Sequence, residues 1–243
     1  MARRTTIINT RLEILQEATR LFLTEGYSNA TVSNIANRVG ISLGNLTFHF
    51  PTKESLLEEL IKHLCAYHML VMEQEIDDGK TSLLAYLMEL ASMMAICDED
   101  AIARDLYISA YTHSLPLRLI RQSDTEKAKL VFSKFRPEWT DEDFAAAENI
   151  VSGIEYASLR KENAEDVSLD KRITSSLRAV MRLYNVPEEL RNIKIDKIHA
   201  MDYRRIGSRL INGFTKYVED VNRKALEEVL EQEKLRGGDD NDS

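Results

Sequence analysis

Hydrogen-bonding residues gather in two short runs near the N terminus, each at the start of an apolar stretch. Thr31 precedes "VSNIANRV", and Ser42 precedes "LGNLTFHF", which contains Gly44, Asn45 and Thr47. A hydroxyl residue in this position caps a helix, and the free amide groups of a helix N terminus bind phosphate. An amide side chain can form two hydrogen bonds with an adenine edge. This spacing favours recognition of a nucleic acid by a short helix.

The candidate contacts divide into those that position a protein on DNA and those that read its sequence. Candidate phosphate partners are Thr31, Ser42, His49 and Lys53, and candidate base readers are Gly44, Asn45, Thr47 and Phe48. For each of them the alternative is a solvated surface residue. Phe48 either packs inward or contacts a thymine methyl group, whereas Phe22 and Phe50 are expected in the core. Arg3 and Arg4, on an expected flexible arm, are candidates for a minor groove or a solvated tail.

Two tightly joined helices must position these side chains. A helix-turn-helix needs a small residue where its helices cross and a residue that tolerates positive φ in the turn. Ala36 and Gly40 meet these two requirements. The apolar residues expected to hold the second helix on the first are Ile35, Val39, Ile41 and Leu46. The same spacing also fits a tight corner in an ordinary helical bundle.

The rest of the chain has a helical pattern as well. Apolar residues recur every three or four positions, and only four prolines and nine glycines interrupt the 243 residues. Gly26 is expected to end the first helix, and Gly40 the second. Further helices are expected at 53–75, 81–97, 99–113, 124–135, 141–161, 168–185 and 197–233. The sequence therefore predicts an all-α protein.

The run from Thr10 to Ile61 resembles the N-terminal DNA-binding domain of TetR-family transcriptional regulators. The resemblance covers "LFLTEGY" at the end of the first helix, "TVSNIANRVGIS" across the second helix and the turn, and "HFPTKESLL" entering the fourth. It implies a three-helix helix-turn-helix head, residues 1–52, and a helical ligand-binding and dimerisation domain, residues 53–236, that begins with a connecting helix at 53–75. Residues 237–243 contain no apolar side chain and are expected to form a disordered acidic tail.

Two positions depart from the family pattern. The family commonly has a tyrosine where this chain has Thr47, and a basic residue where it has Leu43. Thr47 can donate to a phosphate or touch a thymine methyl group, but it reaches less far than a tyrosine. Leu43 cannot pair with a phosphate. The resemblance therefore supports DNA binding and leaves the operator sequence undefined.

The net charge of −8 is distributed unevenly along the chain. Residues 1–55 contain six basic and four acidic residues, a net charge of +2, while the other 26 basic and 36 acidic residues give −10. A polyanionic partner is therefore expected to bind the N-terminal residues.

A late helix pair is the expected dimer interface. Residues 141–161 are rich in Ala, Ser and Gly, which let helices approach closely, and two such pairs can form a four-helix bundle across a two-fold axis. The expected interface residues are Ile150, Gly153, Ile154, Ala157, Leu177 and Met181. The resemblance also implies a dimer interface on such a pair, and the alternative is two core helices of a monomer. The helix expected at 197–233 either extends this interface or covers a ligand cavity.

Methionine and aromatic residues of the second domain are the candidate ligand contacts. Flexible methionines with a few polar groups suit a small-molecule cavity, although such stripes more often belong to a core. The candidates are Met69, Met72, Tyr86, Met93, Tyr107, Tyr111 and His113. The connecting helix, which runs from the DNA side to Met69 and Met72, is the expected lever between ligand and head.

Together these features predict a homodimeric transcriptional regulator, a repressor that a small-molecule effector releases from a palindromic operator in double-stranded DNA. The alternatives are a DNA-binding helical protein without an inducer and a helical enzyme, for which no phosphate-binding glycine loop or nucleophile elbow is present. No cofactor or metal is expected, because Cys65 and His68 supply only two of the usual four ligands. Without a secretory signal or an apolar stretch of about 20 residues, the protein is expected in the cytoplasm.

Overall fold

The computed structural model describes residues 2–79, 81–160 and 167–238 and confirms the all-α prediction, with no strand among these residues. The α-helices are α1 (Ala2–Thr24), α2 (Val32–Val39), α3 (Leu43–His49), α4 (Lys53–Glu75), α5 (Leu83–Glu99), α6 (Ala101–Thr112), α7 (Ser114–Phe132), α8 (Asp141–Leu159), α9 (Leu169–Leu183), α10 (Glu188–Ala200), α11 (Tyr203–Asn212) and α12 (Phe214–Gly238). A short 3-10 turn, Ser133–Phe135, follows α7.

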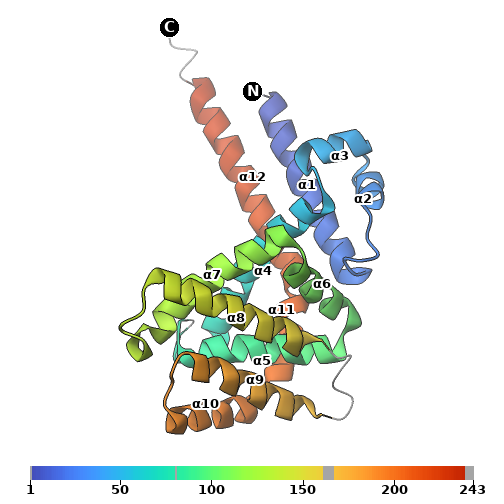
Figure 1. The fold of residues 1–243 in the computed structure, drawn as a ribbon. Coiled ribbons are helices and arrows are strands. Elements are labelled where there is room, and N and C mark those ends of the chain that lie inside the picture. Colours follow the sequence, from blue (N-terminus) through green and yellow to red (C-terminus); the bar gives the residue numbers. More distant parts are fainter. Residues whose placement is uncertain (1, 80, 161–166, 239–243) are drawn as a thin grey trace.

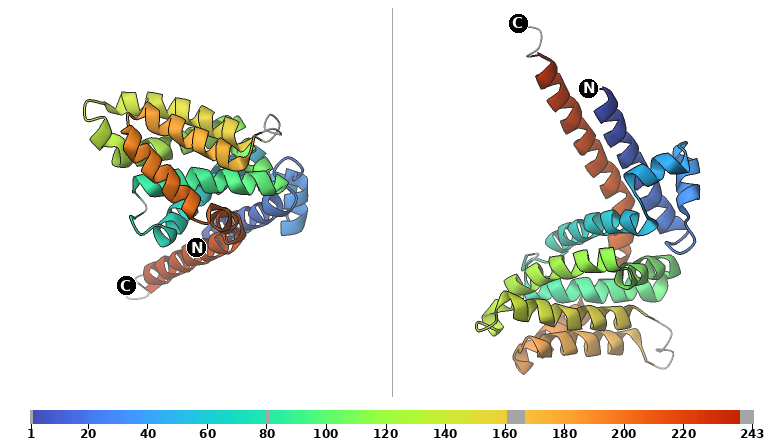
Figure 2. Two further views of the ribbon diagram at one scale, coloured as in Figure 1. Left: turned by 90° about the horizontal axis from the view of Figure 1, so that it is seen from below. Right: turned by 45° about the horizontal axis from the view of Figure 1, so that its top comes forward.

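Helices α1 to α3 form a small head on one side of the larger helical body (Figure 1). Phe22, Ile35, Leu46 and Phe50 fill the core of the head, as expected for both phenylalanines. Helix α4 leaves the head and packs against α7 and α5 in the body. The body is built from layers, with α8 and α9 lying on the far side of α5 and α7 from the head (Figure 2).

The C-terminal region differs from the single helix expected at 197–233. It is split into α10, α11 and α12, and α10 begins at Glu188. Asp202 starts α11 by accepting a hydrogen bond from the Arg205 amide, at 3.0 Å. Gly207 lets α11 lie so close to α5 that an added Cβ would collide with the Ser92 carbonyl oxygen. Close packing therefore overrides a continuous apolar pattern in the sequence.

Helix α12 turns back from the body and runs beside α1, antiparallel to it (Figures 1 and 2). Val218 of α12 is buried, and the Asn222 side-chain amide donates to the Leu12 carbonyl at 3.2 Å. The head is therefore held by α4 on one side and by the C-terminal helix on the other.

Three smaller expectations also change. Helix α1 begins at Ala2, so Arg3 and Arg4 belong to a helix rather than to a flexible arm. Helix α7 begins at Ser114, ten residues before its expected start at 124. Helix α12 continues to Gly238, into the stretch expected to be a disordered tail, and residues 239–243 lie outside the described residues.

Candidate nucleic-acid interface and ligand cavity

The turn between α2 and α3 has the backbone geometry that its sequence predicts. Gly40 ends α2 with φ of 80°, in the left-handed region that favours glycine. Its amide and that of Ile41 donate to the carbonyl groups of Asn37 and Ala36, at 3.2 and 3.0 Å. These bonds close the last turn of α2 and direct the chain into α3.

Helix α3 is capped at its start and held by one buried side chain. The Ser42 hydroxyl accepts from the Asn45 amide at 3.1 Å, and Leu46 is fully buried. The opposite side of the helix is exposed and presents Gly44, Asn45, Thr47 and Phe48. Phe48 is 68% exposed, which selects the outward of its two expected orientations. All four candidate base readers therefore lie on one accessible surface.

The candidate phosphate partners differ in how accessible their side chains are to DNA. Thr31 and Ser42 are exposed helix caps. Lys53 is engaged within the protein, since its ammonium group lies 4.1 Å from the centre of the Tyr27 ring and 3.5 Å from the Ser28 carbonyl oxygen. Burial and the nearby Arg11 lower the pKa of His49, which favours a neutral imidazole there.

Sequence reasoning missed Arg11 at this surface. Its guanidinium lies 4.2 Å from the centre of the Phe50 ring, donates to the His49 carbonyl oxygen at 3.1 Å and pairs with Glu59. Arg11 therefore joins α1 to the end of α3 and to α4. Its place on the first helix, 38 residues before His49, gave no local signal of this contact.

The head meets the body where α6 ends and α7 begins. Asp105 of α6 accepts from the Ser28 amide at 2.8 Å, and Glu54 accepts from the Leu115 amide at 2.9 Å. The His113 ring lies 3.5 Å from the Tyr27 hydroxyl oxygen. His113 was expected at the ligand site, but it lies at this head–body contact because it directly follows α6.

The body contains a cavity between α4, α5, α6, α7 and α8. The space inside it that a water molecule's centre can occupy is about 40 Å³, enough for a few ordered waters. The lining residues are Ile61, Leu64, Cys65, His68, Tyr86, Glu89, Leu90, Met93, Tyr107, Ala110, Tyr111, Ile120, Asp124, Lys127 and Glu155. Four expected ligand contacts, Tyr86, Met93, Tyr107 and Tyr111, are among them.

Two further expected ligand contacts lie elsewhere. Met72 is buried and Met69 half-buried on α4, but neither lines the cavity. Helix α4 presents Ile61, Leu64, Cys65 and His68 to the cavity, and Met72 lies one helical turn beyond His68, past the end of the cavity lining.

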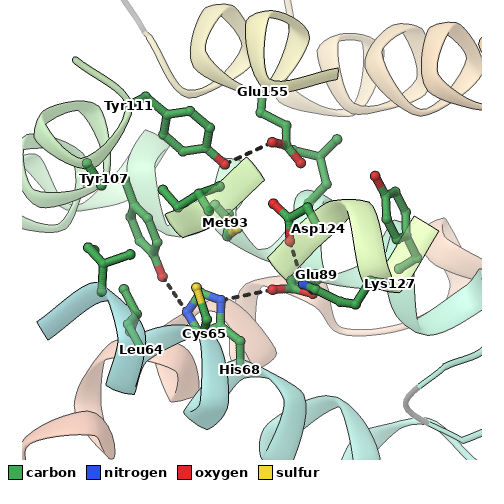
Figure 3. Close-up of a pocket in the computed structure, with 15 residues that line it drawn as sticks. Leu64, Cys65, His68, Glu89, Met93, Tyr107, Tyr111, Asp124, Lys127 and Glu155 are labelled. Atoms are coloured by element: carbon green, nitrogen blue, oxygen red, sulfur yellow. Dashed lines mark hydrogen bonds and ion pairs between the residues drawn. The ribbon is translucent and has the colours of Figure 1, made fainter. Parts of the chain in front are cut away.

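A connected set of charged side chains occupies one side of the cavity (Figure 3). The Lys127 ammonium lies 2.9 Å from a Glu89 oxygen and 3.0 Å from an Asp124 oxygen. The His68 ring joins Glu89 through Nδ1, at 3.2 Å, and the Tyr107 hydroxyl through Nε2, at 2.9 Å.

Two more buried carboxyl groups come from α8. Glu155 accepts from the Tyr111 hydroxyl at 2.9 Å and lines the cavity. Glu148 lies behind it and accepts from the hydroxyl groups of Tyr86, at 3.3 Å, and Tyr184.

Burial and neighbouring charges shift the pKa values of these carboxyl groups in opposite directions. Burial alone would raise the pKa of Glu89, but Lys127 and His68 outweigh it and bring that pKa down to about 2. Burial and the nearby Asp124 raise the pKa of Glu148 to about 7. Burial, Asp124 and Glu148 raise the pKa of Glu155 well above its ordinary value. Glu89 is therefore ionised at neutral pH, whereas the raised pKa of Glu155 disfavours its carboxylate form.

Sequence reasoning did not identify this charged network. Its members come from four helices, and apart from Asp124 and Lys127, which lie three residues apart on α7, no local spacing connects the paired residues. The available signals were indirect: Glu89 interrupts the apolar run "SLLAYLMELASMMAIC", and Glu148 and Glu155 are separated by two helical turns.

No group of three or more potential metal-ligating side chains occurs among the residues that the structure describes. Both nitrogens of the His68 ring already face Glu89 and Tyr107. Burial raises the pKa of the Cys65 thiol to about 12, so the thiolate that a metal needs is disfavoured. In the described part of the chain, no helix is long and apolar enough to cross a membrane.

The expected dimer face is only partly available on the surface. Ile150 is 56% exposed, and Gly153 and Ala157 are also exposed, with Ile154 half-buried beside them. Leu177 and Met181 were expected at the interface, but both are 0% exposed. They point from α9 into the protomer's own core and have no surface to offer a partner.

Comparison with known proteins places the head in a family. Residues 14–60 match the family described as "Bacterial regulatory proteins, tetR family". The chain is 34% identical over 93 residues to the nucleoid occlusion factor SlmA of Vibrio campbellii, which covers 38% of this chain and 47% of that protein. It is 38% identical over 88 residues to the HTH-type transcriptional repressor KstR2 of Mycolicibacterium smegmatis, which covers 35% of this chain and 42% of that protein. The matches thus span less than half the length of either relative.

Solved structures give a broader but weaker likeness. Full-length native TylP, a TetR regulator from Streptomyces fradiae, covers 82% of this chain and 93% of its own, with a TM-score of 0.44 at 17% identity. The TetR-family protein CprB from S. coelicolor A3(2) covers 84% and 98%, with a TM-score of 0.42 at 20% identity. The matched residues 14–60 contain all of α2 and α3 and the turn at Gly40, so the head of this chain is similar to the DNA-binding part of the TetR family of bacterial regulators.

Proposed function

We propose that this protein is a transcriptional repressor that binds a palindromic operator as a two-fold dimer and leaves it when a small molecule occupies the cavity. The observation that carries the proposal is the surface of α3. It presents Asn45, Thr47 and Phe48 together, on a helix fixed by the Ser42 cap and the buried Leu46. Such a helix fits the major groove, where amide, hydroxyl and apolar groups distinguish base pairs.

A dimer follows from the way a helix-turn-helix reads DNA. A palindrome presents two half-sites about 34–36 Å apart, so two recognition helices must be held at that spacing. The exposed stripe of Ile150, Gly153 and Ala157 on α8 supplies an apolar, closely packing surface for a second copy. We assign the interface to this stripe and to the exposed side of α9.

Helix α6 is the connection between cavity and head in this proposal. It carries Tyr107 and Tyr111, which line the cavity, and Asp105, which binds the Ser28 amide of the head. A ligand that displaces α6 would move this attachment point. The ligand shifts the equilibrium only by the difference between its affinities for the two arrangements.

Selection of bound fragments from a random double-stranded DNA library tests this function. The full chain should enrich a palindrome with half-site centres about 10 base pairs apart. The matched control is the double variant Asn45→Ala, Thr47→Ala, in which exposed side chains change and Leu46 stays in place. Equal enrichment by the control, or no enrichment by either protein, would contradict sequence-specific binding through α3.

A further inference from the structure

We propose that the effector is an organic cation, with an ammonium group attached to an apolar or aromatic body, and that its binding widens the cavity beyond the present space for a few waters. This inference rests on the proposed function, because it names the chemical class of ligand for the same cavity.

The charges that line the cavity are unbalanced. Three carboxyl groups, from Glu89, Asp124 and Glu155, face one ammonium group, from Lys127, and one imidazole, from His68. With every carboxyl group ionised, the net charge is −2 when the imidazole is neutral and −1 when it is protonated, and a proton on Glu155 makes either value less negative by one. Unpaired charge in a low-dielectric interior is costly, so the cavity favours either a proton on Glu155 or a bound cation that takes the place of that proton.

Lys127 does not compensate all three carboxyl groups. It lies between Glu89 and Asp124, within 3.0 Å of both. An incoming anion would have to break these ion pairs to reach the ammonium group. An incoming cation meets no unpaired positive charge among the described lining residues.

Glu155 is the group left for the ligand. Its side chain points into the cavity from α8 and receives the Tyr111 hydroxyl hydrogen bond (Figure 3). Among the residues that the structure describes, no Lys, Arg or His side chain forms an ion pair with it. A ligand ammonium beside Glu155 would therefore supply the missing partner.

The rest of the lining fits the other end of such a molecule. Leu64, Leu90, Met93 and Ile120 give the cavity an apolar wall. The rings of Tyr107 and Tyr111 stand beside the charged side (Figure 3). Aromatic faces attract cations within about 6 Å, and flexible methionine side chains adjust to irregular ligands. The cavity thus pairs a carboxylate end with an apolar end, as a hydrophobic amine requires.

Ligand binding should also release a proton. In the empty cavity, burial and the nearby carboxyl groups of Asp124 and Glu148 raise the pKa of Glu155 and disfavour its carboxylate form. The titratable and charged groups around it are Asp124 and Lys127 of α7, Glu148 of α8, Tyr111 of α6, Tyr86 and Glu89 of α5, Cys65 and His68 of α4, and Tyr184 after α9. A bound ammonium stabilises the carboxylate, so the Glu155 O–H proton leaves to solvent as the cation binds.

A charge series with one aromatic body tests the proposal. The probes are 2-phenylethylamine, 2-phenylethanol and 3-phenylpropanoate, each titrated into the full-length protein at pH 7 by calorimetry. The amine should bind at least about tenfold more tightly than the alcohol, and the anion should be weakest. Titrations in two buffers with different ionisation enthalpies should reveal proton release for the amine alone. Equal or tighter binding of the alcohol or the anion, or no binding of the amine at millimolar concentration, would overturn the proposal.

Glu155→Gln provides the residue-specific test, with the exposed Glu188→Gln of α10 as matched control. The first variant should remove both the preference for the amine and the proton release, and the control should keep both. An unchanged preference in a folded Glu155→Gln protein would contradict the assignment. If that variant does not fold, Tyr111→Phe, which removes the donor to Glu155, should still change the measured proton release.

Operator binding measured on the same samples separates this inference from the proposed function. If the protein binds its operator but prefers the alcohol, the proposed function is supported and the assignment of a cationic effector is contradicted. If the protein prefers the amine but binds no DNA, the proposed function is contradicted and the assignment of a cationic ligand is supported.

Discussion

Gly40 and Gly44 lie four residues apart and have different physical roles. Gly40 has φ of 80°, and an added Cβ there would meet no atom within 4 Å, so only its backbone conformation requires glycine. Gly44 is helical, and an added Cβ would only reach the Ser42 hydroxyl oxygen at 4.0 Å. The glycine at position 40 is therefore needed for the backbone of the turn, whereas Gly44 leaves the exposed surface of α3 without a side chain at that position.

Alanine at each glycine should separate these roles. Gly40→Ala should lower the free energy of unfolding by about 1–2 kcal/mol, the cost of a left-handed non-glycine residue. Gly44→Ala should raise it by up to about 1 kcal/mol, because alanine favours a helix, yet it should weaken operator binding by holding α3 away from the bases. Urea unfolding and DNA titration measure the two quantities. Unimpaired operator binding by Gly44→Ala would argue against a close approach at this position.

Asn45 is the residue expected to read a base. Its amide donates to the Ser42 hydroxyl, while its side chain is exposed. Asn45→Ala should therefore leave the fold intact and lose about 1–3 kcal/mol of discrimination at one base position. Titration against operators that carry each base in turn measures this loss. A uniform loss across all sequences would assign Asn45 to the phosphate backbone instead.

Glu148 should make stability depend on pH. Its pKa rises from 4.5 in the unfolded chain to about 7 in the folded protein, so folding takes up a proton between these values. The resulting stabilisation is complete below pH 4.5 and is lost as pH rises through 7, a change of about 3 kcal/mol. Glu148→Gln should lose less stability than the parent protein between pH 5 and 8 in urea titrations. If the free energy of unfolding changes with pH in the same way for Glu148→Gln and the parent protein, Glu148 does not take up a proton on folding.

At the scale of elements, local signals predicted the head better than the body. The caps Thr31 and Ser42 and the turn glycine Gly40 act within a few residues, and all three are as the sequence indicates. The cavity could not be predicted in this way, since it is assembled from five helices. The apolar periodicity also failed to predict the break between α11 and α12, where segments approach closely. An added Cβ at Gly213, between these helices, would collide with the Tyr67 hydroxyl oxygen.

The packing of α12 on α1 gives the C-terminal helix a role in the head. Val218 is 1% exposed, and Glu219 pairs with Arg20 of α1 at 3.2 Å. Val218→Asp would bury an unpaired carboxylate, so it should destabilise the head and weaken operator binding. Glu228→Gln, an exposed change on the same helix, is the control. Hydrogen exchange should show loss of protection in α1 for the first variant alone; full protection of α1 would mean that the head does not depend on α12.

At the scale of the whole molecule, the dimer decides whether two copies of α3 can meet one palindrome. An added Cβ at Gly153 would meet no atom within 4 Å, so the protomer itself accommodates a side chain there. Gly153→Arg should therefore leave the protomer folded, place a charge in the contact between copies, and produce a monomer with weak operator binding. Sedimentation with and without a duplex measures this, and Glu188→Arg on exposed α10 is the control. If Gly153→Arg sediments as a dimer, the two-fold contact lies on another surface, and the spacing of the recognition helices is set there.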